Sequence, residues 1–126
     1  MTVGACILGC SGTVLTRDER AFFAEAQPWG FILFARNIGA PDQVRALTGA
    51  LREAVARADA PILVDQEGGR VQRLGPPHWP RRPAAGDFAR LRDLASTPDL
   101  VRLGARLLAH DLAAVGIDVN CLPVLD

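Results

Sequence analysis

The chain has 126 residues, 14 basic and 14 acidic side chains, a formal net charge of zero and 49% hydrophobic residues. This composition supports one hydrophobic core, and it excludes a disordered chain and a protein that binds nucleic acid through surplus positive charge. All the cations are arginines, and six of them lie between residues 70 and 92, which leaves a local preference for anions open.

The alternation of apolar and amphipathic segments predicts an α/β fold without an internal domain boundary. Four apolar runs predict strands, at residues 4–10, 30–34, 60–65 and 116–126. Helical spacing predicts helices at residues 16–26, 41–58, 85–95 and 98–115, and a loop rich in Gly, Pro and Arg at residues 68–83. Continuous apolar strands separated by helices indicate a parallel sheet covered on both faces. Periodicity alone leaves a doubly wound sheet and a barrel equally open.

Local signals support the first two helices. Thr16 and Glu19 have the spacing of a capping box, so the first helix is expected to begin after Thr16. In the second helix one face is apolar, formed by Val44, Leu47, Leu51 and Val55. The chain stops at the end of its fourth strand with no helix to cover it, so we expect the sequence to be part of a longer protein.

Neither a membrane segment nor an anchor is expected. No apolar run reaches the roughly 18 residues of a transmembrane helix. Residues 7–10, ILGC, resemble a lipoprotein cleavage box, but no basic residue precedes them and the apolar stretch is too short for a signal core, so we interpret this run as a buried strand. The three cysteines, Cys6, Cys10 and Cys121, form no CxxC pair, which predicts core residues in a reducing cytoplasm and no metal site.

Ligands of parallel sheets and barrels bind at the carboxyl ends of the strands. The polar residues expected there are Ser11, Arg36, Asn37, Asp65, Gln66, Glu67 and Asp126. Asp65 and Glu67 are two positions apart, so on an extended chain their side chains point the same way, roughly 6.5–7 Å apart. That separation is compatible with the carboxylate pair of a glycosidase. Alternatively, one carboxylate binds substrate or an arginine and the other caps a loop.

Gly68 and Gly69 allow a backbone with positive φ and a close approach to a ligand. Arg70 and Arg73 carry planar donor groups suited to carboxylates or paired hydroxyls, or to an ion pair with Asp65 or Glu67 that stiffens the loop. His78 is expected to be an exposed loop residue. The stretch GCSG, residues 9–12, lacks the spacing of a phosphate-binding loop, and no cofactor is expected.

Three segments resemble the bacterial β-N-acetylhexosaminidases of glycoside hydrolase family 3. They are GFILFARNI at residues 30–38, DQEGGRVQR at 65–73 and GIDVNCLPVLD at 116–126, where Cys121 and Leu122 replace a Phe-Ala pair. Their order and spacing agree with the family over nearly the whole chain. The resemblance implies about the first half of a (β/α)8 TIM barrel, because such barrels need about 250 residues.

The resemblance also implies a function. The family removes terminal β-linked N-acetylglucosamine from peptidoglycan fragments with retention, through a covalent intermediate. By resemblance Asp65 and Arg73 bind the sugar, Gly68 and Gly69 shape the loop and Glu67 is structural, while the aspartate nucleophile and the histidine–aspartate acid/base pair come from later segments. The expected partner is an N-acetylglucosamine-containing muropeptide or saccharide, and the isolated chain is expected to self-associate.

Two other interpretations stay open from the sequence. A stand-alone sugar-binding or regulatory module made of half a barrel would leave the edge strands unpaired, which is a hazard for aggregation. An α/β nucleotide-binding domain lacks support because the phosphate loop is missing.

Overall fold

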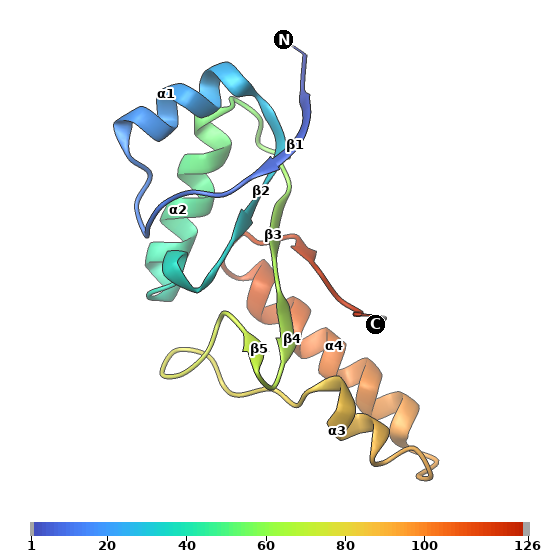
Figure 1. The fold of residues 1–126 in the computed structure, drawn as a ribbon. Helices are drawn as coiled ribbons and strands as arrows, with labels where there is room; N and C mark the ends of the chain where they lie inside the picture. Colours follow the sequence, from blue (N-terminus) through green and yellow to red (C-terminus); the bar gives the residue numbers. More distant parts are fainter. Residues whose placement is uncertain (1, 125–126) are drawn as a thin grey trace.

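The computed structural model describes residues 2–124, so the expected site residue Asp126 lies outside the described part. Four parallel strands form one sheet in the order β1 (Gly4–Leu8), β2 (Pro28–Leu33), β3 (Ile62–Val64) and β6 (Val119–Asn120) (Figure 1). The predicted parallel α/β architecture is therefore confirmed. In residues 2–124 the sheet is open, with β1 at one edge and β6 at the other.

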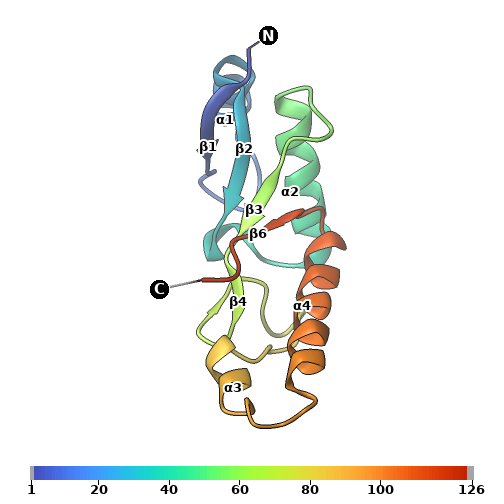
Figure 2. The same cartoon turned by 90° about the vertical axis from the view of Figure 1, so that its right-hand side faces the viewer.

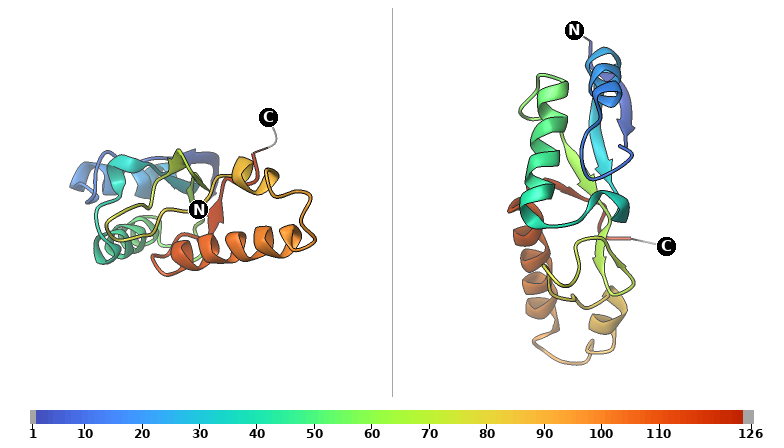
Figure 3. Two further views of the ribbon diagram at one scale, coloured as in Figure 1. Left: turned by 90° about the horizontal axis from the view of Figure 1, so that it is seen from below. Right: turned by 90° about the vertical axis from the view of Figure 1, so that its left-hand side faces the viewer.

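The helices are α1 (Arg17–Ala26), α2 (Pro41–Ala54), α3 (Ala85–Ala89) and α4 (Thr97–Ala113), with a short 3-10 helix η1 (Ala35–Asn37) after β2. Figures 2 and 3 show α2 and α4 on the same side of the sheet. The predicted capping box is present, since Thr16 accepts a hydrogen bond from the Glu19 N–H and Glu19 accepts one from the Thr16 N–H. The second helix ends four residues earlier than predicted, at Ala54.

The core lies between the sheet and its helices. All four residues predicted for the apolar face of α2 are buried, and they pack with Phe31, Leu33, Ile62 and Val64 of the central strands. Phe23 of α1 contacts Phe31 edge to face, with ring centroids 5.0 Å apart. The two central strands are therefore the best-covered part of the sheet.

The edge strand β1 differs from the prediction of a sheet covered on both faces. Ile7 is 44% exposed, and Trp29 of the neighbouring β2 is 43% exposed. Successive side chains of a strand point to opposite faces, and three consecutive residues of β1 are exposed, so neither face of this strand is fully covered, although Leu8 packs against the core. The expectation of three core cysteines is likewise wrong for Cys6, which is exposed; Cys10 is buried and Cys121 is half-buried.

The expected loop after β3 contains a hairpin. Strands β4 (Gln66–Gly68) and β5 (Val71–Gln72) pair antiparallel immediately beyond the carboxyl end of β3. In the parallel sheet, Leu33 aligns with Val64 and Val64 aligns with Asn120, so β2, β3 and β6 end at one level. No helix in residues 2–124 has the length and apolar character needed to cross a membrane.

Candidate functional site

An ion pair stands where the end of β3 meets the hairpin. The carboxylate of Asp65 lies 3.4 Å from Nη2 of Arg73, and the two side chains are 27% and 30% exposed. The pair is thus accessible to a small polar ligand while most of its surface is covered by protein. Of the ion pairs that the sequence left open, the one between Arg73 and Asp65 is present. In the described part of the chain, Nε of Arg73 is buried without a hydrogen-bond partner.

The two glycines close the hairpin as expected. Gly68 and Gly69 have φ of +84° and +59°, a region that other residues rarely adopt. A Cβ on Gly68 would collide with the carbonyl oxygen of Pro83, and one on Gly69 would lie 2.6 Å from the Cβ of Ala84. The chain after the hairpin therefore folds back directly onto this turn, and the Gly69 N–H donates to the Arg82 carbonyl at 2.8 Å.

Gln66 is the buried centre of the hairpin. Its side chain is fully buried, and Oε1 accepts hydrogen bonds from the backbone N–H groups of Arg73 at 2.8 Å and Leu74 at 3.0 Å. Its Nε2 donates to the Leu74 carbonyl at 2.9 Å. The backbone of Gln66 is held from β6, because its N–H donates to Oδ1 of Asn120 at 3.0 Å and its carbonyl accepts from Nδ2 of Asn120 at 2.8 Å.

The segment after the hairpin is anchored on two sides. Gln72 donates from Nε2 to the carbonyls of Leu74 and Pro80, both at 2.8 Å, and accepts from the Arg82 N–H at 2.9 Å. The guanidinium of Arg82 lies 2.7 Å from Asp111 on α4, and both side chains are less than one-fifth exposed. The long loop is therefore tied to a helix rather than free.

The ends of β1 and β2 are joined by a separate buried network. Asn37 is fully buried and donates to the carbonyls of Cys10 at 3.1 Å and Gly12 at 2.8 Å, and it accepts from the Phe34 N–H. Arg36 donates to the same Cys10 carbonyl, and its guanidinium carbon lies 4.9 Å from the centre of the Phe34 ring. Asn37 is thus structural, whereas Arg36 is exposed at the strand end.

Cys121 lies beside the ion pair. Its N–H donates to the Val64 carbonyl at 2.9 Å, which places it across from Asp65 at the end of β6. Burial, the negative charge of Asp65 and a hydrogen bond with that carboxylate together raise the pKa of the Cys121 thiol. The thiol is therefore kept neutral next to the carboxylate.

The other predicted residues take lesser positions. Glu67 is half-buried, Arg70 and Ser11 are exposed, and within residues 2–124 none of their side chains joins the Asp65–Arg73 pair. His78 is exposed in the loop, as expected. The structure brings together Asp65, Arg73, Gln66 and Asn120, and the last of these was not predicted. A buried glutamine between two more exposed carboxylates is the signal that could have indicated the network, because buried amides must satisfy their hydrogen bonds.

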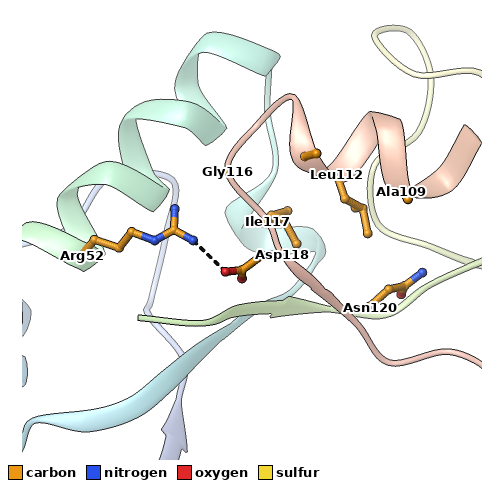
Figure 4. Close-up of a pocket in the computed structure, with 8 residues that line it drawn as sticks. Arg52, Ala109, Leu112, Gly116, Ile117, Asp118 and Asn120 are labelled. Carbon is orange, nitrogen blue, oxygen red and sulfur yellow. Dashed lines mark hydrogen bonds and ion pairs between the residues drawn. The ribbon is translucent and has the colours of Figure 1, made fainter. Parts of the chain in front are cut away.

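The surface has two hollows, and Asn120 of the network around Gln66 lines one of them. One is lined by residues of α2, α4 and β6, and its ion pair, Arg52 with Asp118 at 3.4 Å, stands at the amino ends of β3 and β6 (Figure 4). The other runs along the exposed β1 strand beside Trp29. Neither is lined by Asp65 or Arg73. In the described range, no cluster of three or more His, Cys, Asp or Glu side chains could hold a metal ion.

Comparison with known proteins agrees with this architecture. Residues 8–126 match the model described as the glycosyl hydrolase family 3 N terminal domain. Proteins named beta-hexosaminidase from Alkalilimnicola ehrlichii and Pseudomonas aeruginosa are 41% and 40% identical over 100% and 98% of this chain. The chain spans only 36% and 35% of the length of these relatives.

A solved structure is similar over the same range. NagZ from Neisseria gonorrhoeae, determined in complex with N-trifluoroacetyl-D-glucosamine, superposes with a TM-score of 0.90 at 31% identity. The match covers 98% of this chain and 37% of the NagZ chain.

Proposed function

Because the chain belongs to glycosyl hydrolase family 3, we propose that the complete protein is a β-N-acetylhexosaminidase to which this chain contributes part of the sugar site. The observation that carries the proposal is the half-exposed Asp65–Arg73 pair, held on a hydrogen-bonded hairpin at the carboxyl end of a central strand. Ligands of α/β sheets and barrels bind at this end. The complete protein would close the sheet into a barrel, of which these strands form about the first half.

In this proposal Asp65 and Arg73 bind the terminal N-acetylglucosamine. The Asp65 carboxylate accepts hydrogen bonds from sugar hydroxyls, and the Arg73 guanidinium donates to a second oxygen of the sugar. Arg73 also orients Asp65 by standing 3.4 Å from it before the sugar arrives. The binding of a glucosamine derivative by the similar NagZ supports a sugar of this class.

The bond-breaking groups belong to other segments of the complete protein. Hydrolysis with retention requires a nucleophilic carboxylate and an acid/base group placed about 5–5.5 Å apart. Asp65 has an arginine as its ionic partner, at 3.4 Å. This arrangement supports a binding role for Asp65 and disfavours the local carboxylate pair.

We place the substrate among peptidoglycan fragments and the protein in the cytoplasm. The support is the family resemblance for the substrate and the three free cysteines for a reducing compartment, since Cys6 is exposed and would be open to oxidation elsewhere. The reaction needs no cofactor, because carboxylates and a histidine supply the proton transfer and the nucleophile.

A non-catalytic half-barrel module is disfavoured by the surface. The β1 edge of the sheet carries exposed apolar groups, Ile7 of β1 and Trp29 of the neighbouring β2. Further β/α units of the same protein would cover these groups, whereas a stand-alone module would leave them in water.

The test is hydrolysis of a chromogenic N-acetyl-β-glucosaminide by the complete protein and by the chain of residues 1–126. We expect turnover by the complete protein and none by the short chain. Turnover by the short chain that disappears on Asp65→Ala or Glu67→Ala would restore the local carboxylate pair. A complete protein that neither binds the sugar nor hydrolyses the glycoside would contradict the proposed function.

A further inference from the structure

We propose that Gln66 and Asn120 act together as positioning residues that set the Asp65–Arg73 pair for sugar binding. The inference rests on the proposed function for its consequence, but the geometry that supports it is independent of the ligand. Neither residue needs to touch the sugar. Their role would be to fix the hairpin backbone from which both sugar contacts project.

The reach of the Arg73 side chain depends on where its backbone is held. Its side chain reaches Asp65 only if its backbone is held at one place on the hairpin, and β5 ends one residue earlier, at Gln72. Oε1 of Gln66 accepts the Arg73 N–H at 2.8 Å and the next N–H, of Leu74, at 3.0 Å. The Gln66 side chain therefore continues the hydrogen bonding of the hairpin beyond β5, at Arg73 itself.

The backbone of Gln66 is itself held in place by Asn120. The Asn120 side chain forms hydrogen bonds with the backbone N–H of Gln66 at 3.0 Å and with its carbonyl at 2.8 Å, although Asn120 lies 54 residues later in the sequence. Asn120 is itself in β6, aligned with Val64 at the end of β3. The two contacts hold the peptide groups on either side of Gln66, and the first of these follows Asp65 directly. The main sheet therefore sets the location of Gln66 and the direction of the Asp65 side chain.

Because Gln66 is fully buried, water cannot replace the hydrogen bonds that its side chain makes. Gln66 has no exposed surface, so any side chain without an acceptor at its end would leave the N–H groups of Arg73 and Leu74 unpaired in the interior. The hairpin would have to move to rehydrate them. A displacement on the order of 1 Å at a binding group can reduce the rate of an enzyme about 10²-fold.

A matched control is available in the same hairpin. Gln72 also makes three side-chain hydrogen bonds, to Leu74, Pro80 and Arg82, but none to Arg73. Gln66→Met and Gln72→Met thus remove equal numbers of hydrogen bonds with nearly the same change in shape. Gln66→Glu keeps the acceptor for both N–H groups but replaces the donor to the Leu74 carbonyl with a carboxylate oxygen.

The experiment measures three quantities for each variant of the complete protein: the Kd of N-trifluoroacetyl-D-glucosamine by fluorine NMR, KM and kcat with a chromogenic glycoside, and Tm. For Gln66→Met we expect Kd and KM to rise by about tenfold or more with kcat within about threefold, because binding equal in ground and transition states is lost. Gln72→Met should lower Tm by less, because Gln72 is only half-buried, and should change Kd by less than about twofold. Gln66→Glu should recover part of the affinity that Gln66→Met loses.

Asn120→Ala provides the second variant and a coupling test. If Asn120 acts through Gln66, the double variant should raise Kd by clearly less than the product of the two single effects. Multiplicative effects would overturn the proposal that the two act as one unit. Asn120→Ala also decides the question if Gln66→Met does not fold, since it leaves the Gln66 side chain intact and releases only its backbone.

Other outcomes overturn the inference separately from the proposed function. A Gln66→Met protein that binds the sugar as the unmutated protein does, or a Gln72→Met protein that loses as much affinity, would refute the positioning role. If the unmutated protein neither binds nor hydrolyses the sugar, the proposed function fails, and a crystal structure of Gln66→Met then decides the inference. A Nη2–Oδ2 separation between Arg73 and Asp65 that stays near 3.4 Å would refute it.

Discussion

Replacing Asp65 in the complete protein should weaken sugar binding without abolishing the chemical step. The carboxylate accepts hydrogen bonds from hydroxyls as a charged acceptor, and each such contact contributes about 1.5–3 kcal/mol. Two contacts amount to about 3–6 kcal/mol, or on the order of 10²–10⁴ in kcat/KM. We therefore expect Asp65→Ala to lose this much and Asp65→Asn, which keeps the shape and one acceptor, to lose less.

The effect of the same substitutions on stability should be smaller. The ion pair with Arg73 spans 3.4 Å, and both partners are more than one-quarter exposed, so water screens it. Pairs of this kind contribute about 0–1 kcal/mol to folding. A loss of kcat/KM with little change in Tm would separate a binding role from a structural one.

The decisive assay is covalent labelling of Asp65→Ala with a mechanism-based fluorosugar, followed by mass spectrometry. If the nucleophile lies elsewhere, the folded variant should still be labelled at saturating reagent. Two results would refute the reasoning: a folded Asp65→Ala protein that takes no label, or a label in the unmutated protein that maps to Asp65 itself.

Burial raises the pKa of Glu19, but hydrogen bonds from Thr16 and Ser11 outweigh it and lower the pKa to about 2. The stability that Glu19 contributes is thus present above its ordinary pKa and is lost as the pH falls from about 4.5 to about 2. In urea titrations, Glu19→Gln should therefore lower the free energy of unfolding by roughly 1 kcal/mol near neutral pH and by almost nothing at pH 2. Gly68→Ala should destabilise the protein by at least about 1–2 kcal/mol, because φ is +84° and the new Cβ meets the Pro83 carbonyl; an unchanged Tm would show that the hairpin adapts. The chain of residues 1–126 alone should dimerise or aggregate, since each ~1,000 Å² of apolar surface left in water forfeits about 25 kcal/mol; a sharp monomer peak in light scattering with cooperative melting would contradict this.

The regular parts of the fold were predictable because their signals are local. The capping box at Thr16 and Glu19 marks the first residue of α1, and four apolar residues at helical spacing mark the buried face of α2. The alternation of strands and helices indicates a parallel sheet but leaves the strand order open, because a doubly wound sheet and a barrel order their strands differently. The exposure of β1 was not predictable in this way, because an apolar run indicates burial without showing which segment provides the cover.

The candidate site was predictable in part. Asp65, Arg73 and the two glycines stand out by residue type, and the ion pair joins side chains only eight residues apart. The hairpin itself gives no periodic signal, since β4 and β5 have three and two residues and carry Gly, Gln and Glu. The role of Asn120 depends on a contact between distant segments, which neither segment reveals alone.

The contact between Asn120 and Gln66 also sets an order of events during synthesis. A ribosome that adds about 5–20 residues per second needs roughly 3–11 s to make the 54 residues that separate the two partners. Through that interval β1, β2, β3 and α2 can already pack, whereas the peptide after Asp65 still lacks the amide that holds it. The hairpin of β4 and β5 is therefore expected to reach its final position after the core beneath it, and in a nascent chain that stalls before β6 the peptide after Asp65 would lack its hydrogen-bond partner.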